Sequence, residues 1–161
     1  MITLTKYESQ YRTAFENYPL SEEHLTFTAH PLKLLVRSEN TPTYNPIVIL
    51  EEEKVAGFFV LYTGDDKFNY TEEQDSILLR GYSVHPDFQG RGIAKKSMRL
   101  LPAFTAKHFP HVNQIVLGVN EANKAAQSVY LQSGFIDEGK RFTGRSGVQI
   151  AMSLKLPIPV E

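Results

Sequence analysis

Positions 89–95, Gln-Gly-Arg-Gly-Ile-Ala-Lys, hold the residue types and spacing best suited to chemistry in this chain. They follow an apolar run at 77–84 that predicts a strand, which Pro86 ends because proline cannot donate to a strand ladder. An amphipathic helical pattern begins directly afterwards. A glycine turn between a strand and a helix presents free backbone N–H groups and the positive end of a helix dipole to an anion. The sequence therefore predicts a ligand that carries phosphate at 89–95.

Two known phosphate-binding loops do not fit this turn. The P-loop needs a longer glycine spacing that ends in Gly-Lys-Ser or Gly-Lys-Thr, and the sequence contains none. A dinucleotide fingerprint would start near the first strand and would place glycine or alanine at position 95, which is lysine. The turn could also be an ordinary tight connection, with Arg91 and Lys96 on a solvated helix face.

A second pattern lies downstream, after a short apolar run at 115–119 that predicts a buried strand. It consists of Asn123, Ala126, Tyr130 and the pair Gly134-Phe135. Taken singly, Asn123 is typical of a local capping residue and Tyr130 of a core aromatic side chain. Gly134 stands where a left-handed residue ends a helix.

Together the two patterns resemble the acyl-CoA-binding motifs of the GCN5-related N-acetyltransferase (GNAT) family. The family's Gln/Arg-x-x-Gly-x-Gly/Ala stands here as Gln89, Gly92 and Ala94, and the downstream pattern matches the family's Asn-x-x-Ala-x-x-x-Tyr-x-x-x-Gly-Phe. The resemblance is specific over 77–135 and looser elsewhere. It implies an α/β fold with a GNAT-type mixed, mostly antiparallel central sheet flanked by helices, and with splayed parallel strands at the cofactor cleft. It also implies acetyl-CoA or coenzyme A as co-substrate, and no metal.

The resemblance also implies roles for individual residues. Backbone amides at 89–94 would hold the pyrophosphate, and the backbone at 82–84 would pair with the pantetheine arm. Asn123 would bond that arm, and Tyr130, the one catalytic residue expected, would protonate the departing thiolate. A tyrosine of ordinary pKa, about 10, is protonated at neutral pH and can donate. The expected cofactor-binding residues are Tyr82, Ser83, Val84, Gln89, Gly90, Arg91, Gly92, Ile93, Ala94, Lys95, Asn123, Ala126 and Tyr130.

The acceptor side departs from the family. Some members carry a glutamate on the strand before the glycine turn, as a base for the acceptor amine. Here that strand offers Arg80 and Tyr82 and no carboxylate. The base is therefore open between a water chain and the carboxylates Glu51, Glu52, Glu53 and Asp65, while Glu22 and Glu23 could attract a cationic amine or merely cap a helix.

The implied function is transfer of the acetyl group of acetyl-CoA to a primary amine by direct attack. A small-molecule amine, such as a polyamine-like compound or an aminoglycoside, is favoured as the acceptor and partner. A non-catalytic acyl-CoA-binding sensor, a protein N-acetyltransferase and a nicotinamide-dependent oxidoreductase are the alternatives, and a homodimer is left open.

The remaining elements must position these residues. Alternation and periodicity predict the order β-αα-βββ-α-β-α-ββ, which indicates one α/β domain over 1–161 with a mixed sheet. Pro102 predicts a kink or a break in the helix after the glycine turn. Asn120 is expected to cap the helix that carries Tyr130. Positions 32–37 are ambiguous, 40–46 read as a loop, and the tail 157–161 is expected to be exposed.

Composition excludes several classes of function. The 161 residues carry a formal net charge of −1, which argues against a nucleic-acid partner. The chain has no cysteine, so disulfides, thiolate metal sites and a cysteine nucleophile are excluded. No apolar stretch approaches the roughly 20 residues that span a bilayer, and no signal-peptide pattern is present, so no membrane partner and a cytoplasmic location are expected.

Overall fold

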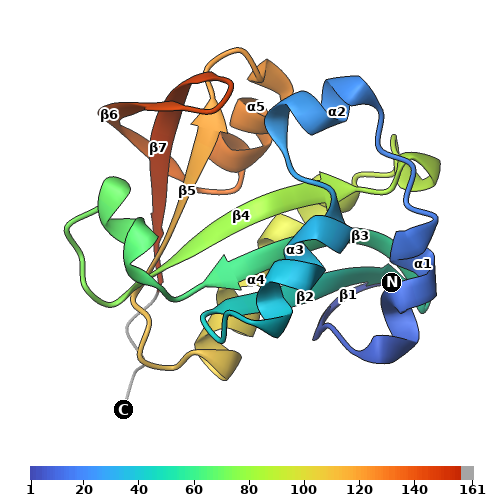
Figure 1. Ribbon diagram of the computed structural model, residues 1–161. Helices are drawn as coiled ribbons and strands as arrows, with labels where there is room; N and C mark the ends of the chain where they lie inside the picture. Colours follow the sequence, from blue (N-terminus) through green and yellow to red (C-terminus); the bar gives the residue numbers. More distant parts are fainter. Residues whose placement is uncertain (157–161) are drawn as a thin grey trace.

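The computed structural model describes residues 1–156, and their strands form one seven-stranded mixed sheet in the order β1-β2-β3-β4-β5-β7-β6 (Figure 1). Neighbouring strands are antiparallel except β4 and β5, which are parallel. The predicted mixed, mostly antiparallel sheet is thereby confirmed. The strands are β1 (Ile2–Lys6), β2 (Tyr44–Glu51), β3 (Lys54–Tyr62), β4 (Ser76–Val84), β5 (Gln114–Asn120), β6 (Ile136–Gly144) and β7 (Gly147–Lys155).

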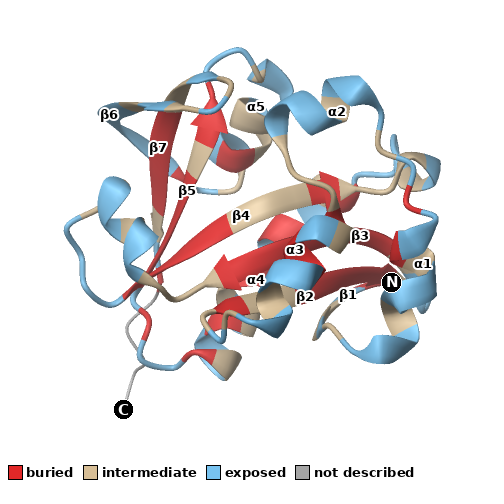
Figure 2. Ribbon diagram, viewed as in Figure 1, coloured by how far each residue is buried: buried red, intermediate tan, exposed pale blue. Residues whose placement is uncertain are grey.

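Helices cover both faces of this sheet, so its central strands are buried on both sides (Figure 2). Alternate residues of β2 belong to two different hydrophobic clusters. Ile47 and Ile49 pack in one cluster with residues of α4 and α5, whereas Val48 and Leu50 pack in the other with residues of α1 and α3. This explains why β2 and β3 read as continuous apolar runs in the sequence. The helices are α1 (Arg12–Glu16), α2 (Glu22–Phe27), α3 (Pro31–Glu39), α4 (Ile93–His108) and α5 (Lys124–Gln132), with short 3-10 turns at Ser9–Tyr11, Asp65–Asn69 and Pro86–Phe88.

Three sequence interpretations need correction or completion. The ambiguous positions 32–37 lie in α3, whose first residue is Pro31 and whose N-cap, His30, accepts a hydrogen bond from the Leu32 N–H at 3.1 Å. The loop expected at 40–46 is wrong at its end, because β2 already begins at Tyr44 and pairs Pro46 with Val60. The tail at 157–161 lies outside the described residues.

Pro102 does not break α4, so the expectation of a break is wrong. Proline has no N–H, and an interior proline costs about 3 kcal/mol and forfeits one helical hydrogen bond. Met98, Leu101 and Thr105 are buried on the inner face of the helix, on both sides of the proline. Their burial against the sheet stabilises the helix and offsets the loss.

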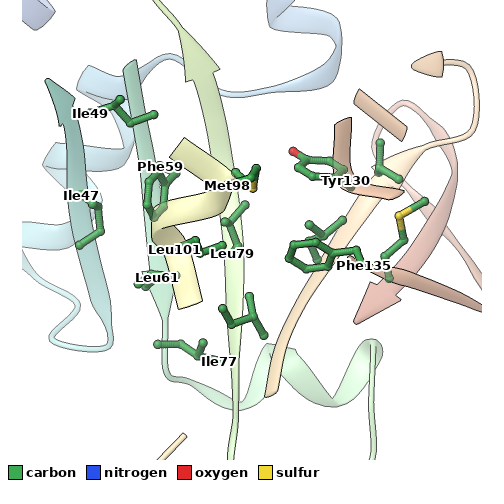
Figure 3. Packing of buried hydrophobic residues seen from close by; sticks show 14 of the residues in the cluster. Ile47, Ile49, Phe59, Leu61, Ile77, Leu79, Met98, Leu101, Tyr130 and Phe135 are labelled. Atoms are coloured by element: carbon green, nitrogen blue, oxygen red, sulfur yellow. The ribbon is translucent and has the colours of Figure 1, made fainter. Parts of the chain in front are cut away.

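Strands β4 and β5 separate after a short paired segment. They pair only at Ser76–Leu78 with Gln114–Val116, although β4 runs on to Val84 and β5 to Asn120. Figures 1 and 3 show the two strands starting side by side and diverging along their length. A parallel pair that separates in this way leaves backbone N–H and C=O groups without a partner strand, as the resemblance implied.

Candidate active site

A bulge in β4 bends this strand where the gap to β5 opens. The register against β3 shifts between Phe58 and Val60, so that Gly81 and Tyr82 together oppose Phe59. Gly81 has a φ of +67°, and a Cβ there would lie 2.3 Å from the Leu34 Cδ1. Only glycine fits both demands, and a bulge increases the local bend and twist of a strand. Gly81 therefore permits the bulge, which lies just beyond Leu78, the last residue of β4 that pairs with β5.

A cavity of about 450 Å³ occupies the gap, and we call it the first cavity. It is bordered by β4, by β5, by α2, by the start of α4 and by the inner face of α5. Eight of the thirteen predicted cofactor-binding residues line it: Tyr82, Ser83, Val84, Gln89, Ala94, Asn123, Ala126 and Tyr130. The fold thus brings both sequence motifs to one cavity, which is of the size that binds a small organic ligand.

The glycine turn presents a run of unpaired amides next to this cavity. Within the described residues, none of the backbone N–H groups at 90–95 has a hydrogen-bond acceptor, and Gly92, the N-cap of α4, has no side-chain cap bond. Gly90 and Gly92 have φ values of +80° and +73°. A Cβ at Gly90 would meet nothing within 4 Å, and one at Gly92 only the Lys96 Cε at 3.9 Å, so space is open above the turn. Free amides at a helix N-terminus suit a phosphate group.

The other predicted residues of the turn differ in what their side chains can do. Ile93 is buried in the core, so only its backbone N–H can face a ligand. The guanidinium of Arg91 lies 3.4 Å from the Glu51 carboxylate and 5.1 Å from the centre of the Phe88 ring. Lys95 is exposed and adds positive charge at the first turn of the helix. The amides of the turn and this charge have the chemistry that the pyrophosphate of coenzyme A requires.

Asn123, not Asn120, caps α5, so that sequence prediction was wrong. The Oδ1 atom of Asn123 accepts from the Ala126 N–H at 3.2 Å. Asn120 is the last residue of β5, and its side chain donates to the Ser146 carbonyl at 2.7 Å. Because capping uses only Oδ1, the Nδ2 group of Asn123 remains a donor at the wall of the first cavity.

Tyr130 lies on the inner face of α5, across the gap from β4. Its ring packs against Phe135 with the ring centres 5.8 Å apart (Figure 3). The centre of the Tyr82 ring lies 6.4 Å from that of Tyr130. Within residues 1–156 no group hydrogen-bonds its hydroxyl, and the residue lines the first cavity. Burial raises the pKa of Tyr130 well above 10, so the hydroxyl keeps its proton at neutral pH.

Tyr82 and Ser83 fix the bent end of β4. The Tyr82 hydroxyl lies 2.6 Å from the Ser97 Oγ, which itself donates to the Ala94 carbonyl, so Tyr82 is the donor. Burial raises the pKa of Tyr82 to about 12. The Ser83 Oγ lies 3.0 Å from the Tyr18 hydroxyl on the other side of the strand. These bonds tie β4 to α4 and to the chain after α1, so the unpaired edge of β4 is held in place.

Most of the carboxylates considered as bases lie away from the gap. Glu51 pairs with Arg91, Glu52 pairs with the N-terminal amino group, and neither lines the first cavity. Glu53 belongs to the β2–β3 turn, where its φ is +72°. Asp65 is exposed in a 3-10 turn. Glu23 is therefore the one carboxylate among the described residues that line the first cavity.

Helix α2, which carries Glu22 and Glu23, borders the gap between β4 and β5. Ser21 and His24 form a capping box at its N-terminus, and the His24 Nε2 lies 3.3 Å from the side-chain amide of Gln89. At its C-terminal end, Arg145 donates to the Leu25 carbonyl at 3.2 Å, and Ser146 donates to the Thr26 carbonyl at 2.6 Å. Because Arg145 and Ser146 belong to the β6–β7 turn, α2 joins the two sides of the gap.

A second cavity, of about 320 Å³, continues from the first toward α3. The two share lining residues, among them Thr28, Gly81 and Gly118. Thr28 comes directly after α2, and its buried Oγ1 has no hydrogen-bond partner in the described part of the chain. A ligand in the second cavity could therefore reach the gap in which Tyr130 lies.

Residues 1–156 contain neither a candidate metal site nor a candidate membrane-spanning helix. No cluster of three or more His, Cys, Asp or Glu side chains there could hold a metal ion. No helix there has the length and apolar character needed to cross a bilayer.

Comparisons with known proteins agree with this geometry. A family model described as the acetyltransferase (GNAT) family matches residues 6–135. The uncharacterised N-acetyltransferase YbbJ of Bacillus subtilis (strain 168) is 32% identical to this chain over 152 residues, which cover 94% of this chain and 95% of that protein.

Solved structures of two acetyltransferases have a similar fold. Aminoglycoside acetyltransferase AAC(6')-Ib in complex with coenzyme A and kanamycin has a TM-score of 0.77 at 17% identity, covering 96% of this chain and 95% of that one. Spermidine N-acetyltransferase from Vibrio cholerae in complex with coenzyme A and spermine has a TM-score of 0.71 at 17% identity and the same coverage. At these identities the similarity is one of fold.

Proposed function

The chain belongs to the GNAT acetyltransferase family and is an acetyl-CoA-dependent N-acetyltransferase, and we propose that its acceptor is the primary amine of a small molecule. The observation that carries this proposal is the second cavity, which joins the first beside the gap between β4 and β5. A cavity of about 320 Å³ accepts a small molecule more readily than a folded protein surface. The fold neighbours that act on aminoglycosides and spermidine support the same class of acceptor.

The residues of the first cavity fit coenzyme A. We assign the unpaired amides at 90–95 to its pyrophosphate and the free edge of β4 at 82–84 to its pantetheine amides. The Nδ2 group of Asn123 is a further donor for the arm. Acetyl-CoA supplies a thioester, whose carbonyl carbon accepts the acceptor's nitrogen.

In the proposed mechanism the acceptor amine attacks directly. The new C–N bond forms from the nitrogen lone pair, and the C–S bond breaks. A backbone N–H near Val84 polarises the carbonyl oxygen, and Tyr130 gives its hydroxyl proton to the departing sulfur. The nitrogen loses one proton to water in the cavity or to Glu23, which lines the same space. No covalent intermediate on the protein is required, which suits a chain without cysteine.

The test is release of the coenzyme A thiol from acetyl-CoA over a panel of primary amines. Turnover of at least one small amine, with the acetylated amine found by mass spectrometry, is the expected result. Tight binding of coenzyme A without turnover of any amine would contradict the assigned reaction. Acetylation of protein N-termini or lysines alone would contradict the choice of acceptor.

A further inference from the structure

The second cavity is lined by positive charge. Four cationic side chains border it: Lys33 and Arg37 from α3, Arg80 from β4 and Arg145 from the β6–β7 turn. Among the described residues, no carboxylate lines this cavity. Since the chain as a whole carries a net charge of −1, this concentration is a local property of the cavity.

Little of this charge is compensated by the protein. Arg80 pairs with Asp66 at 3.4 Å. Within residues 1–156, no carboxylate oxygen lies within 4.0 Å of a charged nitrogen of Lys33, Arg37 or Arg145. A cavity with four cations and one carboxylate beside it repels a cationic ligand and attracts an anion.

Two of the arginines contact the same aromatic ring. The guanidinium carbons of Arg37 and Arg80 lie 5.7 and 5.4 Å from the centre of the same ring, that of Tyr44. Arg37 also donates to the Tyr44 hydroxyl at 3.1 Å. Arg80 stacks over Tyr62 as well, at 5.6 Å. These contacts use ring faces and one hydroxyl, and they leave N–H groups of Arg37 for a planar, bidentate anion.

We propose that the acceptor carries a carboxylate or phosphate group in addition to its amine, and that Lys33, Arg37 and Arg145 bind this anionic group in the second cavity. The inference rests on the proposed function and names the acceptor class within it. With its anionic end at α3 and the β6–β7 turn, the acceptor extends past Thr28 toward the gap. Its amine then lies on the side of Tyr130. A polyamine would bring further positive charge into the same space and is a poor acceptor.

The test uses pairs of acceptors that differ in the anionic group alone. β-Alanine with propylamine tests the carboxylate, O-phosphoethanolamine with ethanolamine tests the phosphate, and spermidine represents a polycation. Initial rates of thiol release give kcat/KM for each. We expect the anionic member of at least one pair to exceed its neutral partner by about tenfold or more, because ionised hydrogen bonds are the strong ones.

The double variant Lys33→Gln, Arg37→Gln tests the residues. Both side chains are exposed, so the variant is expected to fold, and thermal unfolding checks this. The anionic member should lose its advantage over its neutral partner to within about threefold, and the loss should come mainly from a higher KM for the anionic member. Arg12→Gln removes a cation from α1, outside both cavities, and should retain the full advantage. Preference for the neutral amine or for spermidine overturns the inference, as does an advantage that survives in the double variant.

Calorimetry separates this inference from the proposed function. β-Alanine and O-phosphoethanolamine are titrated into the protein loaded with coenzyme A. Binding that the double variant loses supports the anion site even if no amine is acetylated, and then only the proposed reaction falls. Absence of both binding and turnover overturns the inference as well.

Discussion

Replacing Tyr130 by phenylalanine removes one oxygen atom from the wall of the first cavity and leaves the packed ring in place. Because the hydroxyl has no hydrogen-bond partner within residues 1–156, no buried group loses a partner. The free energy of unfolding should therefore change by less than about 1 kcal/mol. The ring keeps its contacts with Phe135 and Tyr82.

The expected effect of Tyr130→Phe on the reaction is much larger. A positioned general acid contributes about 10²–10⁴-fold to the rate, which corresponds to about 3–5 kcal/mol of activation free energy. We expect kcat to fall by this factor while the dissociation constant of coenzyme A changes by less than about threefold. Initial rates of thiol release give kcat, and calorimetry gives the dissociation constant of coenzyme A.

The pH profile gives an independent reading of the same role. Burial raises the pKa of Tyr130 above its ordinary value, so the acid stays protonated through pH 10 and kcat should show no alkaline fall below that pH. On the acid side, kcat/KM should fall as the acceptor amine becomes protonated. An alkaline fall of kcat that begins below pH 10 would contradict the role of Tyr130 as the acid.

Tyr18→Phe is the matched control. Tyr18 is also buried, with a pKa raised by burial, but its hydroxyl bonds the Ser83 Oγ away from the gap. This variant should lose about 0.5–1.5 kcal/mol of stability with kcat within about threefold of the parent. An undiminished kcat in Tyr130→Phe, or equal losses in both variants, would remove Tyr130 from the acid role.

Three further predictions concern the turn, the bulge and the buried tyrosines. Gly92→Glu should abolish detectable binding of coenzyme A in a thermal-shift assay, because it brings a carboxylate to the free amides, while Gly92→Asn, which tolerates a φ of +73°, should weaken binding far less. Gly81→Ala should cost about 1–3 kcal/mol in urea unfolding, and less in a Leu34→Ala background, since the new Cβ would lie 2.3 Å from the Leu34 Cδ1; equal costs in both backgrounds would exclude this clash as the cause. Between pH 10 and pH 12 the free energy of unfolding should fall by at least about 1.4 kcal/mol per pH unit, because burial raises the pKa of Tyr82 to about 12 in the folded chain while the unfolded chain ionises near 10. Tyr18 and Tyr130, whose pKa values burial also raises, should make the fall steeper. Stability that is constant over this range would contradict the burial of these hydroxyl groups.

Local sequence patterns predicted the part of the site that is built from consecutive residues. The glycine turn lies in one segment, and its free amides follow from the strand and helix that flank it. The pattern from Asn123 to Phe135 likewise lies within one helix and its end. Asn120 and Asn123 could each cap that helix by residue type alone. Pairing of β5 with β7 decided between them, because it extends through Asn120 and Gln149.

The second cavity could not be predicted in the same way. Its cations come from α3, β4 and the β6–β7 turn, and Arg37, Arg80 and Arg145 are separated by 43 and 65 residues in the sequence. α3 itself was ambiguous, because its apolar residues fit two periods. Leu32, Leu34 and Val36 alternate as in a strand, whereas Leu32, Leu35 and Val36 have the spacing of a helix. The one local sign was Arg80, a cation on the strand where a carboxylate base was expected.

β4 carries Arg80 and no carboxylate, and one physical argument explains how an acceptor amine could still lose its proton there. An ammonium group near several cations loses its proton more readily, because like charges disfavour the charged form. At roughly 8 Å and an effective dielectric constant of about 20, one unpaired cation contributes about 2 kcal/mol, or about 1.5 units of pKa. One anion bound by Lys33, Arg37 and Arg145 offsets only part of their charge, and the remaining positive charge still favours the neutral amine. The positive charge of the second cavity would then favour the neutral form of the amine, so a carboxylate base on β4 is not needed. A carboxylate on β4 would instead compete with the anionic group of the acceptor for the arginines.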